Sequence, residues 1–310
     1  MRLTIALGGN AILKPGQKGT AEEQLENVYR SCKQIGELAE LGHEIIVTHG
    51  NGPQVGNILL QQSSAAGIPQ LPLDFCGAQT QGFIGYMIQN SLLNVFREKN
   101  LNIESTALVT QVLVDEADPA FDFPSKPVGP FFSREHAEKM QENKKEKWIE
   151  DSGRGWRRVV PSPEPLKIIE KDIINDLIKN NKVVIASGGG GIPVVEKNNR
   201  IQGVEAVIDK DKAGCILAQD TKSDFFFILT DVDNVMINYG SRSEKALGRT
   251  SISQMESYLS EGQFGKGSMA PKVESALKFV KEGGKKSVIT SLDKAVSAFK
   301  GKAGTIITAD

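Results

Sequence analysis

The stretch that decides the fold opens the chain, where residues 3–10 read Leu-Thr-Ile-Ala-Leu-Gly-Gly-Asn. Such a short apolar run is typical of a buried strand, and the glycine pair ends it. A second junction of this kind lies at Val183 to Ser187, which runs into Gly188 to Gly191. Consecutive glycines offer no side chains to a core and are costly to order. Because bare backbone lets several N–H groups approach one anion, both loops indicate a phosphate-handling protein.

Four further apolar runs repeat the form of the first strand, and helical patterns separate them. The expected strands cover residues 3–7, 45–48, 106–114, 183–187, 225–230 and 287–290. Thr20 and Glu23 predict a capping box at the start of the first helix, which Gly42 ends. The other expected helices cover residues 53–66, 79–99, 165–179, 211–219, 253–260 and 269–281. Alternating strands and helices predict an α/β fold, a three-layer αβα sandwich with a mostly parallel central sheet.

The composition is that of a globular protein. Of 310 residues, 39% are hydrophobic, and 37 Lys and Arg nearly balance 38 Asp and Glu, which argues against a nucleic-acid-binding surface. Cys32, Cys76 and Cys215 lack CxxC spacing, so a disulfide framework or zinc site is not expected. No apolar run reaches the roughly 20 residues that span a bilayer, and the first residues lack a signal-peptide layout. We therefore expect a cytoplasmic protein that does not bind membranes.

One stretch interrupts the alternation of strands and helices. Residues 115–163 are rich in proline, glycine, lysine and aromatic residues, as in 123–132 and 153–158. This is too long for an ordinary connection, and its aromatic residues argue against disorder. The pattern predicts a small protruding subdomain at about residues 115–160 with its own packing, in a position to act as a lid.

Glycine or small polar residues follow four of the expected strands, in segments 8–10, 49–52, 187–191 and 230–231. In doubly wound sheets, ligands bind outside the carboxyl ends of the strands, so these segments are expected to converge on one crevice. A single glycine pair is more often only a tight turn, and a histidine such as His49 at a strand end is more often a structural hydrogen-bond donor. Together the four segments favour a site.

Three lysines are candidates for stabilising a transferring phosphoryl group, whose negative charge calls for preplaced cations. Lys210 and Lys272 lie at expected helix starts, where a cation is unfavourable by about 0.3–1 kcal/mol unless an anion binds. Lys126 lies on stiff backbone beside proline. The alternative is that these are solvated surface lysines or, for Lys126, a linker charge. Asp209 and Asp211 flank Lys210 and would orient the lysines, although Asp211 is equally well explained as a helix N-cap.

No cluster of metal-ligand residues is apparent, so a magnesium ion would be held mainly through nucleotide phosphates. Residues 232–239 and Met269 are candidates for holding an adenine ring, or are simply part of the core.

Over essentially its whole length the chain resembles the amino-acid kinase superfamily, and within it the carbamate kinases. The stretches that carry the resemblance are residues 6–11, 49–57, 126–131, 153–157, 159–163, 188–194, 203–211 and 267–272. The family reaction is reversible phosphoryl transfer from ATP to carbamate, giving ADP and carbamoyl phosphate, and in fermenting organisms it typically runs toward ATP. The resemblance identifies 115–160 with the protruding subdomain of that family and favours a homodimer through the helices that begin at Pro53 and Gln79.

The resemblance also implies roles for individual residues. An amino-terminal lobe, 1–208, would bind carbamate and the phosphoryl group through Gly8, Gly9, Asn10, Gly50, Asn51 and Gly52. A carboxyl-terminal lobe, 209–310, would bind the nucleotide with magnesium through Gly189, Gly190, Thr230, Asp231, Val232, Tyr239, Gly267, Ser268, Met269, Pro271 and Lys272. The catalytic set would be Lys126, Asp209, Lys210, Asp211 and Lys272. Gly188 to Gly191 would border the crevice between the lobes.

The chain departs from the wider pattern at two positions. Many superfamily members carry a lysine where this chain has Ala6, which implies that Lys126 or Lys210 replaces its charge. Asp231 stands where carbamate kinases often have glycine. The alternatives are another acyl-phosphate-forming kinase, acetylglutamate-like or aspartate-like, and a non-catalytic nucleotide-binding relative. The former usually lacks the long excursion, and the three lysines argue against the latter.

Overall fold

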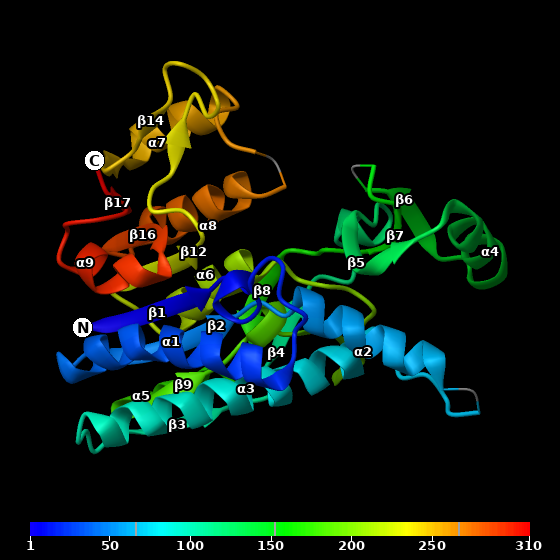
Figure 1. The fold of residues 1–310 in the computed structure, drawn as a ribbon, viewed down its shortest axis with the longest axis horizontal. Helices are drawn as coiled ribbons and strands as arrows, with labels where there is room; N and C mark the ends of the chain where they lie inside the picture. The colour runs from blue at the N-terminus through cyan, green and yellow to red at the C-terminus, as the bar shows by residue number, and fades with distance from the viewer. Residues whose placement is uncertain (66, 152, 266) are drawn as a thin grey trace.

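An eight-stranded sheet forms the middle layer of the molecule in a computed structural model that describes residues 1–65, 67–151, 153–265 and 267–310 (Figure 1). Its strand order is β15-β17-β16-β12-β1-β2-β9-β3. The bounds are β1 Arg2–Leu7, β2 Glu44–His49, β3 Glu104–Ala107, β9 Lys182–Ile185, β12 Phe225–Thr230, β15 Arg249–Ser251, β16 Lys286–Ser291 and β17 Thr305–Thr308. Every neighbouring pair is parallel except β16 and β17, which confirms the predicted mostly parallel sheet.

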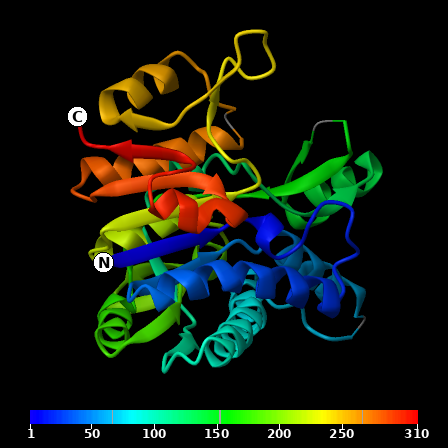
Figure 2. The ribbon, with the colours of Figure 1, turned by 60° about the vertical axis from the view of Figure 1, so that its left-hand side comes forward.

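Helices cover both faces of this sheet (Figure 2). Alternate residues of β1 explain the layers: Leu3, Ile5 and Leu7 pack with α1 (Ala21–Glu40), α3 (Leu73–Glu98) and α9 (Ala295–Phe299). Ala6 points to the other face, where α6 (Lys210–Asp220) and α8 (Met269–Lys281) lie, and α5 (Lys171–Lys179) continues that layer. Because successive side chains of a strand point to opposite faces, a strand buried on both faces is mostly apolar. The one polar side chain buried in β1, Thr4, pairs with the Ser223 hydroxyl at 2.7 Å. The three-layer sandwich is therefore confirmed.

Several predicted boundaries hold. The Thr20 hydroxyl accepts from the Glu23 amide at 3.3 Å while the Glu23 carboxylate accepts from the Thr20 amide at 3.1 Å, which is the predicted capping box. The helix α2 spans Gly52–Ser64, and the predicted end of this helix at residue 66 lies outside the described residues. The helix α7 covers Ile252–Ser260, and α8 has the predicted bounds.

The predicted strand 106–114 is wrong as a single element. It divides into β3 and β4 (Gln111–Val114), which belong to different sheets. The side chain of Gln81 from α3 forms hydrogen bonds with both the amide and the carbonyl of Thr110, at 2.7 and 3.1 Å. The backbone at Thr110 therefore does not continue the pairing of β3 in the eight-stranded sheet. The second sheet has the order β11-β10-β4-β8, with β11 Arg200–Gly203, β10 Ile192–Lys197 and β8 Pro165–Ile168.

Two predicted helix starts are also wrong. Residues 165–168 form β8, which pairs with β4, so the helix expected from Pro165 begins only at Lys171. Glu170, just before that helix, instead accepts from the backbone and side chain of Gln111. The helix expected from Gln79 begins earlier, at Leu73, directly after Pro72.

Residues 115–163 include a small subdomain that projects from the sandwich, as predicted (Figure 1). Its sheet has the order β5-β7-β6, with β5 Lys126–Phe132, β6 Lys147–Glu150 and β7 Trp156–Val160, and α4 covers Arg134–Lys144. The rings of Phe132, His136 and Trp148 pack together and give the subdomain its own core. The remaining elements are the hairpin β13 (Met236–Ile237) and β14 (Lys245–Ala246), and the short turns η1 Gly9–Ala11, η2 Pro119–Phe121, η3 Gly188–Gly190 and η4 Leu292–Lys294.

Candidate active site

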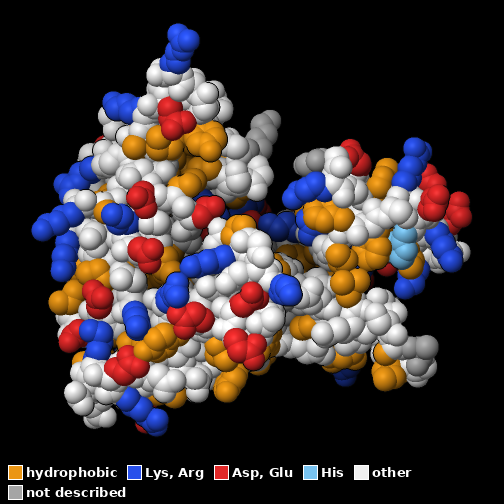
Figure 3. Space-filling view, viewed as in Figure 1, with side chains coloured by type: hydrophobic (Ala, Val, Ile, Leu, Met, Phe, Trp, Pro, Cys, Tyr) orange, Lys and Arg blue, Asp and Glu red, His pale blue; other side chains and the backbone are white. Residues whose placement is uncertain are grey.

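The four glycine-containing or polar segments follow β12, β1, β2 and β9, which are consecutive neighbours in the parallel sheet. Their carboxyl ends meet at one edge, beside a cavity of about 850 Å³. The molecule is hollowed between its main body and the protruding subdomain (Figure 3). The predicted residues that line the cavity are Gly9, Gly50, Asn51, Gly52, Lys126, Gly189, Asp209, Lys210, Asp211, Thr230, Asp231, Val232, Tyr239, Gly267, Ser268, Met269, Pro271 and Lys272.

Gly8, Asn10 and Gly190 are not among the lining residues. The amide of Gly8 already donates to the Leu229 carbonyl at 2.9 Å, and an added Cβ would lie 2.8 Å from that oxygen. Gly8 thus permits the close approach of β12, and Gly9 faces the cavity. Gly190 has a φ of +94°, and a Cβ there would overlap the Ile208 carbonyl. Asn10 lies within the short turn η1.

The glycine tract after β9 packs against the turn after β2. A Cβ on Gly188 would overlap the imidazole of His49, and one on Gly189 would overlap the amide of Asn51. Close packing therefore explains these glycines, which the sequence suggested as a phosphate-handling loop and a boundary of the crevice. His49 is fully buried beside Gly188, its Nδ1 lies 2.9 Å from the Gly50 carbonyl, and burial lowers its pKa to about 4. It is a neutral structural group, which is the more common role of a histidine at a strand end.

Two polar residues of α3 form hydrogen bonds that hold the turns after β2 and β9 in place. The Asn51 amide donates to the Thr80 hydroxyl at 2.7 Å, and the Gln81 amide donates to the carbonyls of Thr110 and Gly188, each at 3.1 Å. Neither Thr80 nor Gln81 was predicted as a site residue. The available signal was a Thr-Gln pair on the apolar face of the predicted helix, because buried polar side chains must find partners.

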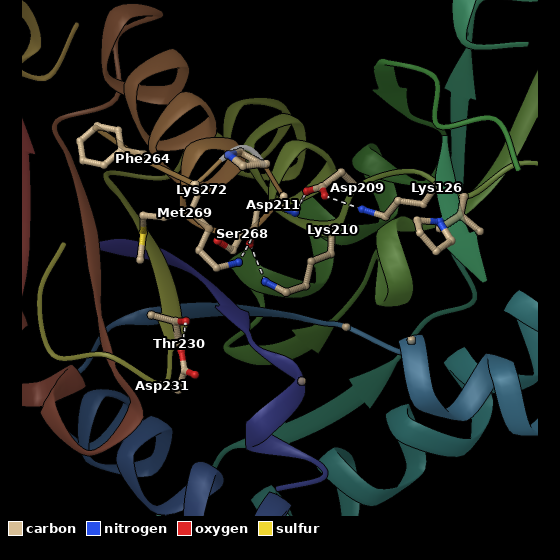
Figure 4. A pocket seen from close by; sticks show the side chains of 18 of the residues that line it. Lys126, Asp209, Lys210, Asp211, Thr230, Asp231, Phe264, Ser268, Met269 and Lys272 are labelled. Carbon is tan, nitrogen blue, oxygen red and sulfur yellow. Dashed lines mark hydrogen bonds and ion pairs between the residues drawn. The ribbon is translucent and has the colours of Figure 1, made fainter. Parts of the chain in front are cut away.

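Three lysines and two aspartates meet in the cavity (Figure 4). Lys210, the first residue of α6, and Lys272, in the first turn of α8, both pair with Asp211, at 2.5 and 2.7 Å. Lys126, the first residue of β5 in the protruding subdomain, pairs with Asp209 at 2.8 Å. Lysines from three separate elements thus converge on one place.

Asp209 is the N-cap of α6, since its carboxylate accepts from the amides of Asp211 and Lys212 at 2.9 and 3.4 Å. The alternative that Asp211 caps this helix is therefore wrong. Burial alone would raise the pKa of Asp209, but the Lys126 ammonium and the capping bonds outweigh it and hold the pKa at about 2. Burial likewise opposes ionisation of Asp211, yet Lys210 and Lys272 lower its pKa. Burial lowers the pKa of Lys210, and the Asp211 carboxylate counteracts this.

The far side of the cavity is more apolar. Phe264 and Met269 lie on the side of Lys272 away from Lys126 (Figure 4). Val232 and Tyr239 line the same cavity, and Tyr239 is 79% exposed. Asn234 and Met236, within the segment 232–239 expected near an adenine ring, also line it, and further lining residues outside the predicted set are Arg157, Val207, Gln263 and Phe264. A cavity with cations at its centre and an apolar end matches a ligand that carries both phosphates and a flat ring.

Within the described ranges, no group of three or more His, Cys, Asp or Glu side chains has the geometry of a metal site. The carboxylates nearest the lysines are already paired, while Asp231 accepts from the neighbouring Thr230 hydroxyl at 3.0 Å. Across those same ranges, no helix combines the length and the apolar character needed to cross a membrane.

The comparisons with known proteins agree with this geometry. The model of the amino acid kinase family matches residues 1–291. A carbamate kinase of Thermococcus kodakarensis is 54% identical over 98% of both chains, and one of Trichomonas vaginalis is 46% identical over 99% of both. A solved structure of carbamate kinase from Giardia lamblia bound to AMP-PNP superposes with a TM-score of 0.95 at 47% identity, covering 100% of this chain and 98% of that one. The chain belongs to the amino acid kinase family, and within that family to the group of the carbamate kinases.

Proposed function

We propose that the protein is a carbamate kinase that transfers a phosphoryl group reversibly between ATP and carbamate, giving ADP and carbamoyl phosphate. The observation that carries the proposal is the convergence of Lys126, Lys210 and Lys272 at the carboxyl ends of four parallel strands. A phosphoryl group in flight carries negative charge on its oxygens, and enzymes accelerate its transfer mainly by positioning and by preplaced cations. Carbamate is already an anion, so no general base is required.

The roles divide along the cavity. Gly9, Gly50, Asn51 and Gly52 would bind carbamate and the phosphoryl group, assisted by the neighbouring Gly8 and Asn10. Lys210 and Lys272 would neutralise the transferring phosphoryl group and the β-phosphate, and Lys126 would approach from the protruding subdomain. Asp209 and Asp211 would orient the lysines and keep them protonated.

The nucleotide would occupy the apolar end of the cavity, against Thr230, Asp231, Val232, Tyr239 and Met269. The lining segment 267–272 adds contacts to its phosphates, and Gly189 with the neighbouring Gly190 borders the crevice from the amino-terminal side. The corresponding division is an amino-terminal lobe at 1–208, carrying the subdomain at about 115–160, and a nucleotide-binding lobe at 209–310.

Lys210 is better placed than Lys126 to replace the lysine that many superfamily members carry at the position of Ala6. Ala6 is fully buried against the core, whereas the aliphatic part of Lys210 lies over Gly50, where an added Cβ would be 3.3 Å from its Cδ. Gly50 directly follows β2, the neighbour of β1 in the sheet, and its amide donates to the Leu7 carbonyl. We propose that Lys210 supplies the positive charge at this end of β1.

Magnesium would bind with the nucleotide, held mainly through phosphate oxygens, because the described residues offer no carboxylate cluster. When bound, the ion would neutralise phosphate charge and orient the phosphates for transfer. We further propose that the physiological direction forms ATP from carbamoyl phosphate, in arginine catabolism or a related route.

A homodimer through the amino-terminal lobe is the second part of the proposal. Phe75, Phe83 and Tyr86 lie on the outer face of α3, exposed to 54%, 40% and 63%, although large apolar side chains are usually buried. Val109, which follows β3 at the edge of the eight-stranded sheet, is 57% exposed. Sedimentation equilibrium should give twice the chain mass, and Tyr86→Lys should shift the species toward monomer. A monomeric wild type would exclude this interface.

The activity is tested by measuring ATP formation from ADP, magnesium and carbamoyl phosphate. Lys210→Ala and Lys272→Ala should each lower kcat by about 10²–10³-fold, as expected for losing one preplaced charge donor, with circular dichroism unchanged. Lys212→Ala is the matched control, because Lys212 follows on the same helix turn but pairs with Glu164 instead of a cavity aspartate. Near-normal turnover in either of the first two variants would refute the charge-stabilisation scheme.

The same assay separates the rival functions. Turnover with acetylglutamate or aspartate in place of carbamate would indicate another acyl-phosphate-forming kinase, which needs room for a larger acid. Nucleotide binding without turnover of any acceptor would indicate a non-catalytic relative.

A further inference from the structure

Arg157 lines the cavity beside Lys126 but lies on a different strand, β7, of the protruding subdomain. Its Nε donates to the Gly129 carbonyl at 3.0 Å and its Nη2 to the Pro127 carbonyl at 3.4 Å. Both acceptors belong to β5, the strand that begins with Lys126. The guanidinium therefore binds the β5 backbone at residues that closely follow Lys126.

The strand β5 needs such support because its own pairing is incomplete. Pro127 and Pro130 have no N–H to donate, and the register between β5 and β7 shifts between Val128 and Phe132. Gly129 sits in this irregular segment with a φ of +74°. Arg157 donates to the carbonyls of Pro127 and Gly129 in this segment and so ties it to β7 through a side chain.

Two further contacts fix the guanidinium itself. Asp151 accepts from its Nη1 at 3.2 Å, and the ring of Phe131 lies 5.3 Å from its central carbon. The Arg157 side chain is 23% exposed. A forked, planar group held on several sides has little freedom to move, which is the property a positioning residue requires.

The same segment is also seated on the main body. A Cβ added to Gly56 of α2 would lie 3.3 Å from the Cα of Gly129, so the two backbones meet without side chains between them. The helix α2 begins at Gly52, in the turn proposed to hold carbamate. The backbone that Arg157 binds thus lies at the junction between the subdomain and α2.

We propose that Arg157 is a positioning residue that acts through Lys126, holding its strand so that the ammonium meets the transferring phosphoryl group. This inference rests on the proposed phosphoryl transfer. Because displacing a catalytic group by about 1 Å can cost a hundredfold in rate, Arg157→Gln should lower kcat by about 10–100-fold. The KM for ADP should stay nearly constant, since the nucleotide would lie at the far end of the cavity. Arg157→Lys should not restore kcat, because one ammonium cannot reproduce the fork.

A double-mutant cycle with Lys126→Ala separates positioning from direct contact. If Arg157 works through Lys126, adding Arg157→Gln to Lys126→Ala should lower kcat by less than about twofold more. A full further loss in that background would mean that Arg157 touches the substrate itself and would overturn the proposal. Arg154→Gln is the matched control, because Arg154 contacts the same Asp151 and the same Phe131 ring without a hydrogen bond to β5. It should keep kcat within about twofold of wild type.

A measurement independent of turnover distinguishes this inference from the proposed function. Acetic anhydride labelling followed by mass spectrometry should modify Lys126 several-fold faster in Arg157→Gln than in wild type or in Arg154→Gln. Wild type that forms no ATP would refute the proposed function while leaving this comparison readable. Equal labelling of Lys126 in all three proteins, with folding verified by circular dichroism, would overturn the positioning role.

Discussion

Replacing Asp211 by asparagine tests the charge network at its centre. The Asp211 side chain is 3% exposed, and each of its two oxygens pairs with one lysine. Asparagine keeps the shape but removes the counter-charge of Lys210 and Lys272, whose side chains are only 15% and 19% exposed. In the free protein, two ammonium groups would then face each other across the cavity without a carboxylate between them.

The expected cost follows from this burial. Breaking a buried ion pair costs about 3–5 kcal/mol, and we take the low end, about 3 kcal/mol, because both lysines retain some contact with water. At about 2.1 cal/mol/K per residue, a chain of 310 residues has an unfolding entropy of about 0.65 kcal/mol/K, so Tm should fall by about 5 °C. Turnover should fall as well, because neither lysine is any longer oriented.

The decisive measurement is calorimetry of wild type and Asp211→Asn with and without saturating ADP and magnesium. Phosphate oxygens would supply part of the missing negative charge, so the difference in Tm between the two proteins should shrink when the nucleotide is present. The control is Asp176→Asn, which removes an exposed pair with Lys179 and should change stability by less than about 0.5 kcal/mol. An unchanged Tm in Asp211→Asn, or a deficit that ADP leaves untouched, would refute the reasoning.

Two further predictions concern His49, the last residue of β2, and Ser187, in the turn after β9. The folded pKa of His49 is about 4, below the ordinary 6.5, so the unfolded state binds its proton first as the pH falls. Stability should therefore drop by about 3 kcal/mol between pH 6.5 and 4, and urea unfolding of His49→Gln should lack this component; equal pH profiles would contradict it. Ser187 has a φ of +54° and a buried hydroxyl with no hydrogen-bond partner among the described residues, so Ser187→Gly should stabilise by about 1 kcal/mol. A lower Tm for Ser187→Gly would disprove that strain.

Local sequence signals predicted the elements whose causes are local. The capping box at Thr20 and Glu23 is formed, and the helix expected at residues 269–281 has those bounds. The errors arose where distant contacts decide. The stretch 106–114 marks the break between the two strands only by polar Thr110 and Gln111 among apolar residues, and the Gln81 side chain that imposes the break comes from α3.

The residues of the candidate site were also predicted only in part. Lys210 and Lys272 could be chosen because a cation at a helix start is a local anomaly. Which lysine pairs with which aspartate could not, since Lys126 and Asp209 are 83 positions apart in the chain. Arg157, Thr80 and Gln81 were not singled out, because their importance lies in the backbone carbonyls and the Asn51 amide that they contact across the fold.

The sequence by itself determined the parallel α/β architecture, the projecting subdomain and the glycine loops at the strand ends, because periodicity, capping and bare backbone are properties of short segments. Only the tertiary structure decided what the glycines do. The absence of a side chain at Gly8 lets β12 approach closely, and at Gly188 and Gly189 it leaves room for His49 and Asn51. These glycines therefore serve close packing. Such roles depend on which atoms meet after the chain has folded, and no local pattern records that.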